Sequence, residues 1–165
     1  VLSRGLGDVY KRQIINYWEH PDPNDEELLY KAVHHNHPCT LWTRQTTGNY
    51  DWHYQLFAEL CNEFTKRFGK THLSESLLLE RLKKHPVKLP KGARTKFPLA
   101  MSNLPECMVE DPVQSYRNYY IAKQSYMPCD WNKGTPMPSW FKKLDVEGVD
   151  MFLQEKRYEQ QYHQV

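Results

Sequence analysis

The sequence lacks any long apolar run. No stretch approaches the roughly 20 apolar residues that a helix needs to cross a membrane, and the mean hydropathy is −0.82. Residues 1–13 also lack the continuous apolar segment of a secretory signal peptide. We therefore expect a cytoplasmic protein without a membrane partner.

Cysteine and glycine are also scarce. The four cysteines form no CxxC pair, which favours free thiols in a reducing compartment over a disulfide framework. The seven glycines are scattered and make no phosphate-binding loop, which argues against a nucleoside triphosphate enzyme. No GxSxG motif or recognisable Cys-His context supports nucleophilic catalysis. We assign no catalytic residue and expect no cofactor.

Strand signals are nearly absent, because no alternating apolar segment is bounded by a two-residue turn. Helical signals are frequent, and we expect an all-α fold: a compact, irregular helical domain with about four to six helices and long proline-rich loops. The expected helices are a short one capped by Asn24 or Asp25, 39–44 after Pro38, one from Thr47 or Asn49 to Gly69, 75–84 capped by Ser74, 112–125 capped by Asp111, and a last helix from Val146.

The clearest helix ends at Gly69. Its apolar residues recur at steps of three and four, which is a helical period, and they are Phe57, Leu60, Cys61, Phe64 and Phe68. Gly69 is typical of a helix stop, and two cations precede it in the last turn, where the helix dipole favours positive charge. Residues 85–105, in contrast, hold four prolines without a period and predict a long surface connection.

Residues 1–13 are similar to a translated sequencing adapter that recurs at the ends of environmental gene fragments. We therefore treat 1–13 as a non-native leader and 14–165 as a single helical domain whose N-terminal part is expected to be missing. Without the leader, basic and acidic residues both number 19, because 22 − 3 equals 20 − 1. Global basicity therefore gives no support to a nucleic-acid partner.

Local charge is strongly uneven. Residues 14–63 carry two basic and eight acidic residues, whereas 66–96 carry ten basic and two acidic ones, and 97–165 carry seven and nine. Such a basic block suggests a surface that faces a polyanion. A solvated lysine-rich loop is the alternative interpretation, and charge alone does not separate the two.

A histidine-rich entry precedes the main helix. His34, His35, His37 and Cys39 have the composition of a metal site, but structural zinc needs four ligands, usually as two close pairs. Cys107 and Cys129 are isolated, so a second pair is absent. We favour capping and surface histidines and expect no metal, while a small zinc-stabilised protein remains an alternative hypothesis.

Two carboxylates lie one turn apart on the main helix. Glu59 and Glu63 share that helix with Phe57 and Phe64, so one of them could sit beside the core with a raised pKa. Solvated acids on the outer face are the simpler interpretation, and the pattern favours it.

Nucleic-acid contact has the best composite support. Cations gather at the end of the main helix and along 83–96, and cations mix with aromatics near the C-terminus. Basic side chains neutralise phosphates, and aromatic rings stack on bases or insert between them. The candidate DNA-binding residues are Lys66, Arg67, Lys70, Arg117, Lys123, Trp140 and Lys142.

Three segments carry a family resemblance. Residues 36–70, 111–123 (DPVQSYRNYYIAK) and 138–142 (PSWFK) resemble a group of bacteriophage proteins, which are themselves similar to pyrimidine-dimer DNA glycosylases of the endonuclease V type. In that type, a Tyr-Asp helix start leads to a Lys-Arg-Gly stretch, as Tyr50-Asp51 leads here to residues 66–69. A Pro-Thr-Trp-Tyr-Lys segment near its C-terminus corresponds to 138–142.

The resemblance implies a compact all-α protein of DNA repair, with glycosylase and AP-lyase activity on double-stranded DNA in the phage-infected bacterial cell. In that family the N-terminal α-amine attacks C1′ of the damaged nucleotide, and a glutamate on the first helix acts as acid and base. Neither residue has a counterpart here, so we expect the 165-residue fragment to bind DNA weakly at best and to cleave nothing. A non-enzymatic DNA-binding or phage accessory module is the alternative.

Overall fold

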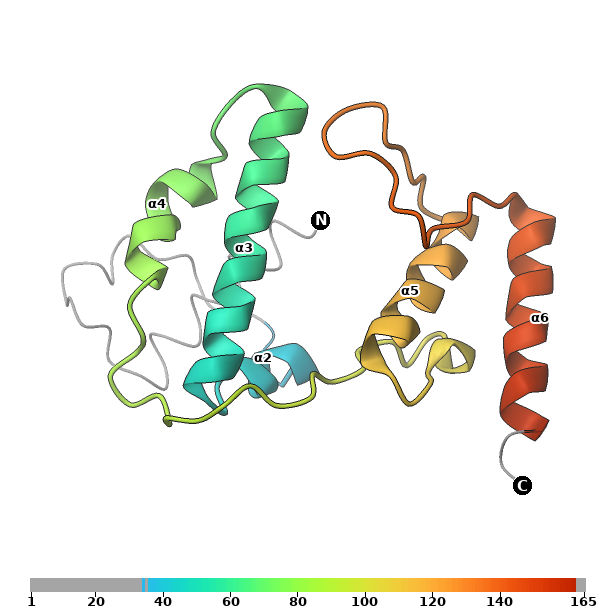
Figure 1. Ribbon diagram of the computed structural model, residues 1–165, viewed down its shortest axis with the longest axis horizontal. Helices are drawn as coiled ribbons and strands as arrows, with labels where there is room; N and C mark the ends of the chain where they lie inside the picture. The colour runs from blue at the N-terminus through green and yellow to red at the C-terminus, as the bar shows by residue number, and fades with distance from the viewer. Residues whose placement is uncertain (1–33, 35, 163–165) are drawn as a thin grey trace. The chain divides into compact units, whose positions relative to one another are not determined.

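The computed structural model describes residue 34 and residues 36–162, and over these residues it is helical without a strand (Figure 1). The expected all-α fold is thereby confirmed. The short helix expected after Asn24 or Asp25 lies outside the described residues, as does the leader 1–13. The described elements are α2 (Pro38–Thr43), α3 (Thr47–Phe68), α4 (Leu73–Leu82), α5 (Pro112–Ala122), α6 (Val146–Tyr162) and the short 3-10 helices η2 (Pro105–Cys107) and η3 (Lys123–Ser125).

The described residues divide into two compact units, with the boundary in the chain between Phe97 and Pro98. Each unit has its own cluster of buried apolar side chains. The single domain over 14–165 therefore stays a prediction. None of the helices described in either unit is long and apolar enough to cross a membrane.

Local capping sets the ends of α2 and α3. His37 precedes α2, and its Nδ1 accepts a hydrogen bond from the Cys39 backbone N–H at 3.2 Å. Thr46 caps α3 through its hydroxyl, which accepts from the Asn49 N–H at 3.1 Å, and Gly69 ends the helix in the left-handed conformation (φ 64°). The expected helix entry at His37 and helix stop at Gly69 are both present, because caps depend on neighbouring residues only.

The cap of α4 differs from the expectation. His72 is the cap, with its Nδ1 accepting from the Ser74 N–H at 3.1 Å, whereas Ser74 itself is buried inside the helix. The prediction of Ser74 was wrong because the imidazole nitrogen of His72, two residues earlier, accepts the capping hydrogen bond. The His72 ring also packs edge-on against Phe64, with centroids 4.7 Å apart, which ties the start of α4 to the end of α3.

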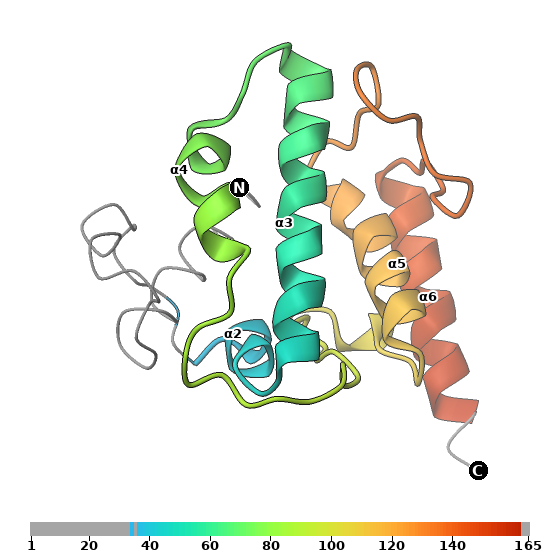
Figure 2. The same cartoon turned by 60° about the vertical axis from the view of Figure 1, so that its left-hand side comes forward.

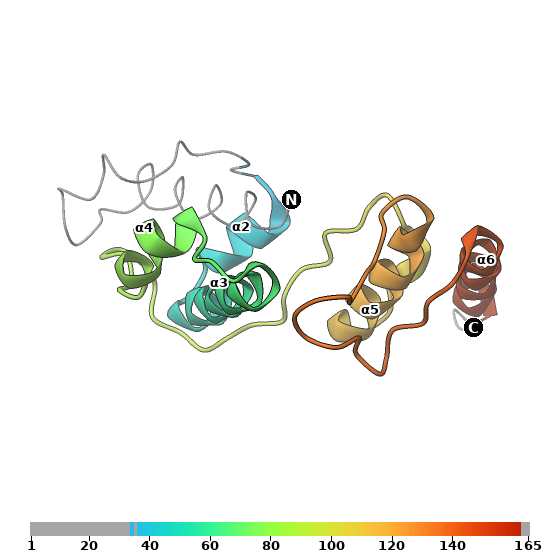
Figure 3. The same ribbon diagram turned by 90° about the horizontal axis from the view of Figure 1, so that it is seen from above.

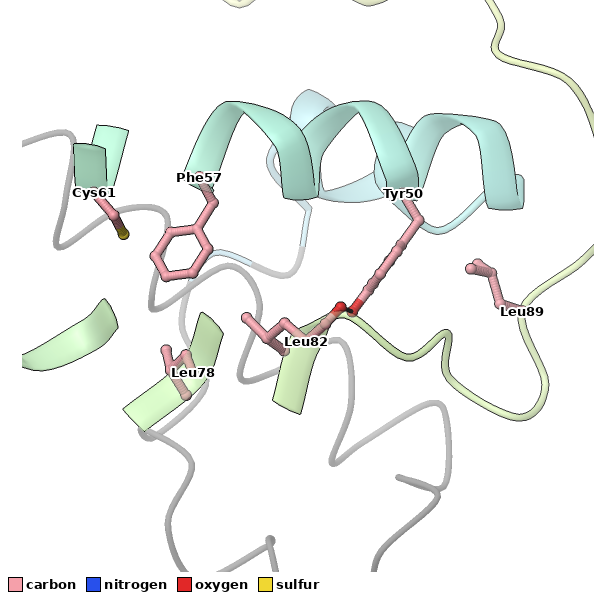
Figure 4. Close-up of a cluster of buried hydrophobic side chains, with 6 residues drawn as sticks. All are labelled: Tyr50, Phe57, Cys61, Leu78, Leu82 and Leu89. Carbon is pink, nitrogen blue, oxygen red and sulfur yellow. Dashed lines mark hydrogen bonds between the residues drawn. The ribbon is translucent and has the colours of Figure 1, made fainter. Parts of the chain in front are cut away.

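Tyr50 lies in the first unit's core, although it is not among the apolar residues that the helical period selects on this helix. Its ring is 1% exposed, and its hydroxyl donates to the Leu82 carbonyl at 2.9 Å. Figure 4 shows this hydroxyl reaching the last turn of α4. Phe68, in contrast, is 57% exposed, because it stands beyond the part of α3 that α4 covers. The core consists of Tyr50, Phe57, Cys61, Leu78, Leu82 and Leu89.

The segment after α4 is fastened to the start of α3. Carbonyls of Pro90 and Gly92 accept the first two helical N–H groups, those of Thr47 and Gly48, at 2.9 and 3.0 Å. The expected surface connection is present, since residues 91–96 are exposed and form no helix. It is also fastened to α3, because these carbonyls satisfy N–H groups that a helix start leaves without partners. Figure 1 shows the segment passing the N-terminal end of α3 beside α2, and Figure 3 shows it from above.

The second unit is built on α5, α6 and η2. Asp111 caps α5 by accepting from the Val113 and Gln114 N–H groups at 3.0 and 3.3 Å, as the Asp-Pro signal predicts. Figure 2 shows α5 and α6 side by side, and they enclose an apolar core with η2. Its buried residues are Met101, Cys107, Ala122, Val149 and Leu153.

Candidate nucleic-acid interface

The seven candidate DNA-binding residues fall into two groups. Lys66, Arg67 and Lys70 lie at the end of α3 in the first unit, and the other four lie in the second unit. Each group is therefore a separate candidate surface. The remaining candidates are Arg117, Lys123, Trp140 and Lys142.

The end of α3 is only partly a free cationic surface. Lys66 and Lys70 are exposed, but the Arg67 Nε lies 2.7 Å from the Glu63 Oε1, one turn earlier on the helix. Arg67 and Glu63 thus form an i, i+4 ion pair on the helix surface. Glu59 is exposed, in agreement with a solvated acid.

In the second unit, Arg117 lies against Trp140. The guanidinium carbon of Arg117 is 5.7 Å from the centroid of the indole ring, which is the geometry of a cation–π contact. Trp140 in turn meets the buried Phe141 edge-on at 5.7 Å, and Phe141 packs on Trp131 at 4.5 Å. The Arg117 guanidinium therefore rests on an aromatic ring that is packed into the unit, even though 23 residues separate Arg117 from Trp140 in the sequence.

A glutamine holds the segment that carries Trp140 and Lys142 along α5. The Gln124 side-chain amide donates to the Lys142 carbonyl at 2.8 Å, and its oxygen accepts the Leu144 N–H at 3.1 Å. Lys123, the neighbour of Gln124, has its ammonium 5.0 Å from the Tyr119 ring centroid. Arg117 of α5 thus lies against Trp140, Lys123 directly follows α5, and Gln124 holds the segment that carries Trp140 and Lys142. We call Arg117, Lys123, Trp140 and Lys142 the α5 patch.

A second basic feature lies in the first unit, on residues 89–96, which we call the strap. The Thr46 hydroxyl donates to the Ala93 carbonyl at 3.0 Å, and the Trp42 indole N–H donates to the Thr95 hydroxyl at 2.9 Å. Asn49 accepts the Thr95 N–H at 2.8 Å and donates to the Trp42 carbonyl at 2.8 Å. Sequence reasoning missed Asn49, since its partner in the strap is 46 residues away.

A buried histidine lies between α2 and α3. The Thr43 hydroxyl has one proton and gives it to the Cys39 carbonyl at 2.8 Å, so the His53 Nδ1–H donates to the Thr43 oxygen at 2.6 Å. Burial lowers the pKa of His53 to about 4, with a smaller contribution from His37. His53 is therefore neutral at pH 7 and acts here as a structural donor.

The histidines and cysteines do not gather into a ligand set within the described part of the chain. No three His, Cys, Asp or Glu side chains there are placed to share a metal ion. His37 uses its Nδ1 as a helix cap. Burial raises the pKa of both Cys61 and Cys107 to about 11, so neither thiol is an activated nucleophile.

Comparisons with known proteins find no relative. No family model, no curated protein and no solved structure matches this chain. The resemblance to phage DNA glycosylases therefore remains a prediction, and function has to be argued from the two basic surfaces themselves.

Proposed function

We propose that this chain binds double-stranded DNA through the α5 patch. The observation that carries the proposal is the placement of Arg117 over Trp140, with Lys123 and Lys142 on the same helix and its attached segment. Arginine held on an aromatic ring keeps its N–H donors directed outward and loses less side-chain freedom when it meets a phosphate.

Charge around the patch favours an anionic partner. Lys142 is exposed, and Lys143 beside it pairs with the exposed Asp130, with 3.6 Å between the Lys143 Nζ and the Asp130 Oδ1. Such exposed pairs contribute little and exchange readily with water. Phosphate neutralisation releases counterions from the duplex, so several cations provide salt-dependent affinity without any base-specific contact.

The experiment measures binding of the whole chain to a 20-base-pair duplex by fluorescence anisotropy across a salt series. Arg117→Ala is expected to weaken binding about eightfold at 0.1 M salt and to lower the slope of log K against log salt by about 0.9, the value for one phosphate contact. Lys156→Met removes one charge from α6, where the ammonium is already paired with Glu159 at 2.7 Å. This control is expected to change affinity less than twofold.

Two results would contradict the proposal. One is the absence of any duplex binding by the folded chain at low salt. The other is an Arg117→Ala variant whose affinity and salt slope match those of the Lys156→Met control.

Glycosylase and AP-lyase chemistry is the more specific form of this proposal. It is supported by the long helix ending in residues 66–69 and by the PSWFK segment 138–142, whose Trp140 contacts Arg117. No described residue corresponds to the family's amine nucleophile or glutamate, so the α5 patch would contribute DNA binding only. Borohydride reduction with the product of the complete gene on DNA containing an abasic site tests it: a covalent adduct supports a lyase, and its absence supports the non-enzymatic binding module.

A further inference from the structure

The strap of the first unit is a second positively charged surface, and nothing in the α5 patch accounts for it. From Arg81 to Pro105 the sequence has no Asp or Glu. Lys91 and Arg94 of the strap are exposed, and among the residues that the structure describes neither forms an ion pair. A run of unneutralised cations in one segment raises the local positive potential.

The strap's backbone is held in one conformation despite its exposure. Contacts to α2 and α3 recur at every third side-chain position: Leu89 is buried in the core, Gly92 lies against Thr46, and Thr95 is bonded to Asn49. This three-residue repeat leaves Lys91 and Arg94, one residue before each of the last two contacts, on the exposed positions. The cations therefore project from a fixed scaffold and not from a mobile loop.

Gly48 shows how closely the strap lies on α3. A Cβ added at Gly48 would be 2.4 Å from the Arg94 backbone nitrogen and 2.7 Å from the Ala93 carbonyl carbon. Both atoms belong to the backbone and cannot rotate away. The position of Arg94 on the surface is thus set by direct contact between two backbones.

We propose that the strap binds the phosphate backbone of double-stranded DNA, with Lys91 and Arg94 as the contacting residues. Residues 83–96 contain no Phe, Tyr or Trp, so the strap offers no ring on which a single-stranded base could stack. Fixed cations without stacking groups suit the regular phosphates of a duplex, because the strap backbone is already ordered by the fold and loses little conformational freedom on binding. This inference rests on the proposed DNA-binding function and adds a second contact surface to it.

The test compares the double variant Lys91→Ala/Arg94→Ala with Lys83→Ala/Lys84→Ala in the whole chain, on a duplex and on one of its strands. Loss of two phosphate contacts is expected to lower the salt slope for the duplex by about 1.8 and the affinity at 0.1 M salt by roughly 60-fold. Lys83→Ala/Lys84→Ala carries the same charge change on the last turn after α4, outside the strap, and is expected to have a clearly smaller effect.

Thr95→Val tests whether the fixed conformation matters, because it removes the strap's hydroxyl bonds to Trp42 and Asn49 without a change in charge. We expect the affinity of this variant for the duplex to be several-fold lower, while its circular dichroism is unchanged. Duplex binding that is intact in the Lys91→Ala/Arg94→Ala variant, or a loss confined to the single strand, would overturn the strap proposal while leaving the α5 patch standing. Absence of duplex binding by the unmodified chain would overturn both.

Discussion

Gly48 and Arg94 meet backbone to backbone: a Cβ placed on Gly48 would lie 2.4 Å from the Arg94 nitrogen. Forty-six residues separate the two in the sequence, and their contact holds the strap against the first turn of α3. The first N–H groups of α3 gain acceptors from the strap, and the strap is held in place by the same contact.

Gly48→Ala is therefore expected to destabilise the protein, by about 1–3 kcal/mol from overpacking. This is the opposite of the usual glycine-to-alanine gain of up to about 1 kcal/mol within a helix. Urea unfolding measures the difference. Gly148→Ala in α6 is the matched control, because the nearest atom there is the side-chain Asp145 Oδ1 at 3.0 Å and not a backbone atom. Equal unfolding midpoints for both variants would contradict the close contact.

Tyr50→Phe is expected to cost about 1–3 kcal/mol, because the buried Leu82 carbonyl at the end of α4 would lose its hydroxyl donor. Tyr54→Phe removes a similar bond, from the Tyr54 hydroxyl to the Leu79 carbonyl at 3.1 Å, but on a half-buried ring. We expect it to cost less than 1 kcal/mol. The denaturant midpoints of the two variants measure these costs. A larger loss of stability for Tyr54→Phe than for Tyr50→Phe would contradict the deeper burial of the Tyr50 hydrogen bond.

Protonation of His53 should weaken the fold in acid. The pKa of His53 is lowered by burial from 6.5 to about 4, so the unfolded chain binds more protons than the folded chain between these two values. Stability falls as the pH falls from about 6.5 to 4, with a total contribution of about 3 kcal/mol. His53→Gln does not titrate and should lose this part of the pH dependence. Unfolding free energies at pH 7.5, 5.5 and 4.5 for both proteins test it, and parallel curves would contradict a neutral buried imidazole.

In the second unit, the Arg157 guanidinium donates to the Glu106 carboxylate at 2.8 Å. Glu106 is buried and Arg157 is half exposed, so Arg157→Met leaves a carboxylate without its partner and should cost about 2 kcal/mol. Lys156→Met, one residue away, breaks the pair with Glu159 and should cost less than 1 kcal/mol. Thermal unfolding of the two variants compares these losses of stability. Equal losses would contradict a stabilising role of the Arg157–Glu106 pair between α6 and η2.

The sequence predicted the parts of the fold that depend on neighbours. His37 before α2, Gly69 after α3 and Asp111 before α5 are short-range caps, and each occupies its expected place. The strap was missed, because its hydrogen bonds join Thr95 to Asn49 across 46 residues and leave no periodic trace. The core role of Tyr50 was missed for the same reason, since Leu82 becomes its partner only when α4 folds back on α3.

The sequence predicted which residues belong to the candidate interface, but it did not predict which of them lie next to one another. The C-terminal aromatic and basic residues pointed to Trp140 and Lys142. Their neighbours were not predicted: Trp140 lies against Arg117, and Lys142 is held by Gln124, a residue without any motif. At the basic end of α3, Glu63 pairs with Arg67 one turn away, whereas Lys66 and Lys70 are exposed. An i, i+4 check of opposite charges would have found that pair.

Duplex binding across a salt series, measured for the whole chain beside Arg117→Ala, tests the central claim most directly. The account predicts salt-dependent binding of the unmodified chain and a slope about 0.9 smaller in the variant, equivalent to one lost phosphate contact. Circular dichroism of both proteins establishes that they are folded. A folded chain that shows no affinity for the duplex at low salt would contradict DNA binding as its function.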